Sequence, residues 1–95
     1  MNILQSENWL TIEGVVKSFA EAQLLKDRIE SITLHNKTVV LEFKDAYSLA
    51  STIIGYLNKK IHVDKVRVSM VVHQEELYEL MQMLSLIQLF EVRRA

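Results

Sequence analysis

The sequence predicts a single domain of α/β class with a central mixed sheet of four to five strands and three helices. Short apolar runs of strand length alternate with longer stretches in which apolar residues recur at spacings of three and four. The 95 residues supply one core rather than two, and no proline or Gly/Ser linker divides them. Because strands that alternate with helices need crossover connections, we expect most neighbouring strands to be parallel.

The first half of the chain predicts a hairpin and then a helix. Residues 9–13 alternate in polarity like a half-buried strand, and residues 1–5 are predicted to pair with them through a turn at 6–8. Ser18 is a helix N-cap candidate, because Glu21 follows it three residues later in a capping-box pattern. The helix then shows an apolar stripe formed by Ala22, Leu25, Ile29 and Ile32.

The second half predicts two strands and two helices in alternation, with a short last strand. Residues 38–43 contain three consecutive apolar residues, which predicts burial on both faces of the sheet, as between two layers of helices. A helix is expected over 48–60, a strand over 65–72, a third helix from Gln74 and a last strand over 89–92, with 93–95 frayed. The inward stripe predicted for the helix at 48–60 is Ala50, Ile53, Ile54, Leu57 and Ile61.

Composition argues against several classes of partner. The formal charge of −1 gives no general attraction to nucleic acid or anionic lipid, and the basic pairs at 59–60 and 93–94 are interpreted as solvated charges. No apolar run reaches the roughly 20 residues that span a bilayer, and residues 1–7 do not look like a signal peptide. Without cysteine the chain has no thiolate metal ligands. A cytoplasmic location is expected.

No pattern in the chain indicates catalysis, a cofactor or a metal site. His35, His62 and His73 each lie at the boundary of a predicted element, without a second ligand at helical spacing. Two glycines in all are too few for a phosphate-binding glycine loop, and no G-x-S-x-G elbow is present. The prediction is a protein that is not an enzyme.

The outer face of the helix predicted at 48–60 differs from those of the other two helices. It carries small and uncharged residues up to a first charge at Lys59: Ser48, Ser51, Thr52, Gly55 and Tyr56. A glycine inside a helix costs about 1 kcal/mol against alanine, yet it permits close approach of another backbone. Two interpretations stay open at this point. The face docks a partner with Tyr56 as an aromatic anchor, or the serines cap the helix while Gly55 relieves crowding against the sheet.

The segment 39–57 resembles the signature of the STAS family. That signature is a buried strand ending near an acidic residue, a short loop, and Asp-Ser-Ser-Gly-Leu-Gly-x-Leu opening a helix. Glu42 aligns with the acidic residue, Ser51 and Thr52 with the two serines, and Gly55 and Leu57 with the later glycine and leucine. Residues 10–14 and 77–92 resemble flanking parts of the family. Ala50 and Ile53 depart from the motif, where the family has Asp and Gly.

The resemblance implies a STAS-like (SpoIIaa-like) layer structure in which the family's C-terminal helix is missing after Val92. It also implies a bacterial anti-sigma-factor-antagonist-like module that docks a partner kinase and is switched by phosphorylation of the first signature serine. Ser51 is then the phosphoacceptor candidate, with Thr52 second. The alternative within the family is an accessory subunit of a phospholipid-trafficking-type ABC transporter that binds its ATPase. A homodimer through the same helix and a small-molecule sensor are further hypotheses.

Overall fold

A computed structural model describes residues 1–95 and contains five strands and three helices. In chain order the elements are β1 (Asn2–Ser6), β2 (Trp9–Glu13), α1 (Phe19–Thr33), β3 (Thr38–Phe43), α2 (Ser51–His62), β4 (Arg67–Val72), α3 (Glu75–Met83) and β5 (Val92–Arg94). The predicted α/β class with a mixed sheet and three helices is confirmed.

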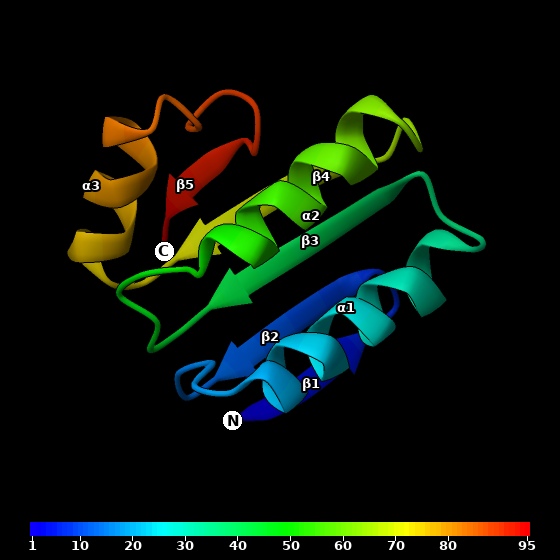
Figure 1. Cartoon of the computed structure of the whole chain (residues 1–95), viewed down its shortest axis with the longest axis horizontal. Coiled ribbons are helices and arrows are strands. Elements are labelled where there is room, and N and C mark those ends of the chain that lie inside the picture. Colours follow the sequence, from blue (N-terminus) through cyan, green and yellow to red (C-terminus); the bar gives the residue numbers. More distant parts are fainter.

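The sheet has the strand order β1-β2-β3-β4-β5 (Figure 1). β1 pairs antiparallel with β2, whereas β2, β3, β4 and β5 are mutually parallel. Each crossover therefore steps to the next strand in the same direction, and right-handed connections of this kind place all their helices on one face. Figure 1 shows α1 and α2 lying across the front of the sheet, with α3 beside β5.

The core fills the space between that face and the helices. Alternate strand residues point into it and are fully buried, among them Leu10, Ile12, Leu41, Phe43 and Met70. The stripe predicted for the first helix, Ala22, Leu25, Ile29 and Ile32, packs against them. The prediction that β3 is covered on both faces was wrong. Val39 and Leu41 are buried beneath the helices, but Val40 is only half-buried, because it points to the face that carries no helix.

Glu42 organises the helix-free face. Its carboxylate accepts hydrogen bonds from Trp9 Nε1 at 3.0 Å and from Thr11 Oγ1 at 3.3 Å, both on β2. Its second oxygen lies 2.6 Å from Nε2 of His73, just beyond β4. The hydrogen bond with His73 holds the pKa of Glu42 below its ordinary value of 4.5. The carboxylate thus ties together three neighbouring chain segments.

The N-terminal predictions agree closely with the structure. The hairpin closes through Glu7 and Asn8, with Glu7 at φ 54°, and the cap of α1 is the predicted Ser18, whose Oγ accepts from the amide of Glu21 at 3.1 Å. The Glu21 carboxylate accepts in turn from the amide of Lys17 at 2.8 Å, one residue earlier than a standard capping box requires.

The C-terminal boundaries differ from the predictions. β4 starts at Arg67 rather than at residue 65, because Lys65 has φ 58°, outside the extended region. The last strand is Val92–Arg94, later than predicted, and its arginines are ordered in the sheet rather than frayed. Turns occupy 84–91, where the amide of Phe90 donates to the carbonyl of Leu86 and Glu91 has φ 46°. Phe90 itself is fully buried.

The lowered pKa of Glu42 predicts a pH dependence of stability. A carboxyl with a lower pKa in the folded state stabilises the fold above its unfolded pKa near 4.5, and this contribution is lost as pH falls through the folded value. In urea unfolding at pH 7, 5, 4 and 3, the unfolding free energy of the wild-type protein should fall more steeply below pH 4.5 than that of Glu42→Gln. Parallel pH profiles for the two proteins would contradict the role given to Glu42.

Candidate functional site

The loop between β3 and α2 is fixed at several points, and it positions the start of α2. Ala46 and Leu49 insert into the core. Asp45 accepts a 2.6 Å hydrogen bond from the amide of Gly14 at the end of β2, and Gln74 at the start of α3 donates to the carbonyl of Lys44 at 3.2 Å. The loop is therefore attached to both neighbouring connections at the carboxyl edge of the parallel strands.

α2 begins at Ser51 with Ala50 as its N-cap, three residues later than predicted. The prediction that Ala50 points inward was wrong. Because residues 44–50 form a loop, Leu49 takes the buried place and Ala50 is exposed. No side chain caps the helix, and its first turn contains no acidic residue. The amides of this end are consequently not screened by a carboxylate.

The outer face of α2 carries small and uncharged residues, followed by one lysine. We call this face, together with Ser48 of the loop before it, the α2 surface. Ser48 was predicted inside the helix but lies outside it, and all members of the surface are exposed: Ser48, Ser51, Thr52, Gly55, Asn58 and Lys59. Asn58 was missed by sequence reasoning, although its spacing of three from Gly55 and seven from Ser51 places it on the same side of a helix. Ser51 and Thr52, the predicted phosphoacceptors, are the first two residues of α2.

Gly55 has no role in packing within the chain. A Cβ built at this position would meet no heavy atom within 4 Å, so the interpretation that Gly55 relieves crowding against the sheet was wrong. Gly14, the other glycine, is different. It has φ +83°, and a Cβ there would lie 3.2 Å from Cα of Met1. The fold therefore needs one of its two glycines but not the one on the α2 surface.

Tyr56 does not belong to the α2 surface, contrary to the prediction that it faces outward as an anchor. It is half-buried against α1, where its hydroxyl donates to the Glu30 carboxylate at 2.5 Å and contacts the Lys26 carbonyl oxygen at 3.3 Å. With Ile53 and Leu57 directed at the sheet, residue 56 lies on the flank of α2 that meets α1. Burial, and then the bond to Glu30, raise the pKa of the Tyr56 phenol.

A buried lysine completes the contact between α1 and α2. Lys60 is only 6% exposed and forms ion pairs with Glu30 and, at 3.0 Å, with Asp64. Burial opposes its charge, but the hydrogen bonds to the two carboxylates outweigh burial and raise the pKa of Lys60. The hydrogen bond from Lys60, followed by that from Tyr56, lowers the pKa of Glu30. This contact fixes which face of α2 is presented outward.

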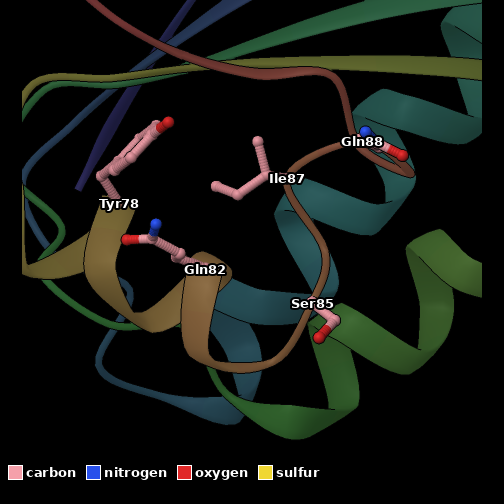
Figure 2. Close-up of a pocket in the computed structure, with 5 residues that line it drawn as sticks. All are labelled: Tyr78, Gln82, Ser85, Ile87 and Gln88. Carbon is pink, nitrogen blue, oxygen red and sulfur yellow. The ribbon is translucent and has the colours of Figure 1, made fainter.

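The rest of the chain offers one hollow and no cluster of metal ligands. The hollow, about 370 Å³, lies between α3 and the segment leading to β5 and is lined by Tyr78, Gln82, Ser85, Ile87 and Gln88. Figure 2 shows the Gln82 amide beside the Tyr78 ring, with Ile87 across from them and Gln88 turned away. None of the lining side chains is an acid, a cation or a histidine, so the hollow presents no acid/base pair.

Comparisons with protein-family models, with curated proteins and with solved structures find no match for this chain. No helix has the length and apolar character needed to span a membrane.

Gly55→Ala should stabilise the protein. The added methyl group meets no neighbour, and alanine is favoured over glycine in a helix interior by about 1 kcal/mol, so the free energy of unfolding should rise by about that amount. Urea unfolding measures the change. Gly14→Ala is the matched control and should destabilise the protein, because φ +83° suits glycine alone. A loss of stability in Gly55→Ala would show that the position is strained.

Tyr56→Phe should destabilise the protein by about 1 kcal/mol, because it removes the hydroxyl that joins α2 to α1. Tyr47→Phe, at the exposed tyrosine of the loop before α2, is the control and should leave the free energy of unfolding unchanged. Equal effects of the two substitutions in urea unfolding would contradict the structural role of Tyr56.

Proposed function

We propose that this chain is a STAS-like regulatory module without catalytic activity, which binds a protein partner through the α2 surface. The partner we favour is a cytoplasmic kinase of the anti-sigma-factor type, and the chain would act as its antagonist. The observation that carries the proposal is Gly55, an exposed glycine within a helix that nothing in the surrounding fold requires.

The α2 surface has the chemistry of a contact region. Interfaces exclude charge from their centres, and from Ser48 to Asn58 this surface contains no charged side chain. Gly55 leaves the helix backbone open to close approach, and Ser51 and Thr52 provide hydroxyls that can donate or accept hydrogen bonds. A folded partner can therefore dock on α2 without burying an unpaired charge.

The STAS-like identity is supported by the way the signature segment is laid out. Glu42 lies next to the last residue of β3, a seven-residue loop follows, and α2 opens with Ser51 and Thr52. This is the strand, loop and helix arrangement in which the family places its signature serines.

The position of Ser51 supports a phosphorylation switch. As the first residue of α2, it is exposed beside amides that no side chain caps. A phosphate there would add nearly two negative charges, which the helix dipole favours, on a surface that is otherwise neutral. The folded chain would tolerate the modification, whereas a partner seated on α2 would have to desolvate the phosphate. Phosphorylation should thus release the partner.

A second candidate function is that of an accessory subunit that binds the ATPase of an ABC transporter. The observation that favours it is Ala50 at the N-cap position of α2. Alanine lacks the carboxylate of the family motif, and no side chain makes a hydrogen bond that caps this helix. Docking on α2 requires only the helix face, so it does not depend on the aspartate that the family has at this position. Phosphorylation is the function that the replacement by alanine affects.

Gly55→Arg should weaken partner binding without unfolding the protein, because the new side chain points into open space in the free chain and into the partner in the complex. A photo-crosslinking residue at position 58 first identifies the partner in cells. The purified partner is then titrated with the wild-type chain, with Gly55→Arg and with Gln23→Arg, which adds the same charge on the exposed side of α1. Affinity should fall at least about tenfold for Gly55→Arg only, a difference of about 1.4 kcal/mol.

The nature of the captured protein separates the two candidates. A kinase that phosphorylates Ser51, detected by mass spectrometry and abolished in Ser51→Ala, supports the antagonist function. A transporter ATPase that binds without modifying the chain supports the accessory subunit. Equal affinities of Gly55→Arg and Gln23→Arg for the captured partner would refute docking on α2.

A further inference from the structure

The two edges of the sheet differ in how well they are protected. β5 is three residues long and carries the exposed arginines Arg93 and Arg94, and short, charged strands discourage further pairing. β1 is five residues long, with the sequence NILQS, and contains no charge and no proline. Its register with β2 runs without a bulge from Asn2 to Ser6. β1 therefore has none of the features that usually block an edge strand.

The pairing with β2 determines which backbone groups of β1 are free. Ser6 is opposite Trp9 across the two-residue turn, and antiparallel pairs alternate between hydrogen-bonded and non-hydrogen-bonded types. The groups of Asn2, Leu4 and Ser6 thus point to β2. The N–H and C=O groups of Ile3 and Gln5 point away from the sheet, to the open edge.

We propose that a second copy of this chain pairs with β1 in antiparallel orientation, about a two-fold axis through Leu4. In this register Ile3 of each copy lies opposite Gln5 of the other, and their outward amides and carbonyls form four hydrogen bonds. The two Leu4 side chains meet on the helix-free face in a non-hydrogen-bonded pair, the type in which side chains approach most closely. The five-stranded sheets join into one continuous sheet.

The chemistry of this edge favours a second copy over an unrelated strand. A two-fold axis pairs β1 with a copy of itself, so a strand with charges of one sign would face the same sign in its partner, and β1 has no charge. Leu4 is 51% exposed and would be covered by its counterpart. Leu24, 46% exposed, lies on the side of α1 that faces β1, because Glu21 one turn earlier pairs with the amino group of Met1 at 3.4 Å.

The interface is independent of the α2 surface, because α2 lies over β3 and β4 (Figure 1), away from β1. One strand and one helix flank form a small contact, below the area of about 1,200 Å² typical of stable complexes. We therefore expect a dimer that dissociates on dilution in the micromolar range.

Cysteine cross-linking tests the register directly, since the chain contains no cysteine of its own. Leu4→Cys should form a disulfide-linked dimer on mild oxidation, because the paired Cα atoms would be about 4.5 Å apart, within the reach of a disulfide. Asn2→Cys alone should not, because its two copies would be about 14 Å apart at the rise of an antiparallel strand. An equimolar mixture of Asn2→Cys and Ser6→Cys should cross-link as a heterodimer.

Sedimentation of the cysteine-free protein tests association without a covalent bond. The weight-average mass of the wild-type chain should rise about twofold with concentration, as expected for a closed two-fold dimer. Gln5→Pro removes one outward amide and should remain monomeric, whereas Gln5→Ala keeps the amide and should dimerise like the wild type. Circular dichroism and thermal unfolding show whether each variant is folded.

Three results would overturn the proposal. One is a wild-type protein that stays monomeric up to about 1 mM, a concentration at which even a weak dimer forms. Another is equal cross-linking of Leu4→Cys and Asn2→Cys, which indicates random collision or another register. Dimerisation that persists in Gln5→Pro but disappears in Gly55→Arg would place the contact on α2 and would also refute it.

Discussion

The direction of the three crossovers determines on which face of the sheet the helices lie. Each helix returns the chain to the next strand on the same side, so the helices form one layer and the sheet keeps one face without cover. That arrangement gives α2 the middle position, flanked by α1 and α3, with its outer surface open (Figure 1). The uncovered face then needs polar side chains that satisfy one another, and Glu42 with Trp9, Thr11 and His73 supplies them.

Sequence reasoning succeeded where one local pattern determines the structure. The cap at Ser18 and the stripe of α1 follow from spacing along one helix, and the hairpin follows from alternation beside a short polar turn. The open face was missed because three apolar residues in β3 look the same whether one or both faces are covered. The contacts of Glu42 depend on register with two other strands, and residues more than 30 positions apart leave no local signal.

The candidate site was predicted in part for a similar reason. The exposed positions of Ser51, Thr52, Gly55 and Lys59 follow from helical geometry. The orientation of Tyr56 depends on where α1 lies, and the place of Ala50 depends on the residue at which α2 begins. Aromatic residues suit both interfaces and internal contacts between helices, so composition could not separate the two roles for Tyr56. Its hydrogen bonds to α1 decide between them.

The buried lysine has a consequence for recognition. Rolling α2 about its axis would break the ion pair between the buried Lys60 ammonium and the exposed Glu30 carboxylate, and it would leave the ammonium group without this partner. The orientation of the helix is therefore set before any other protein arrives. A rigid epitope loses little conformational entropy on association, and this favours affinity even from a small contact made of serine, threonine and glycine.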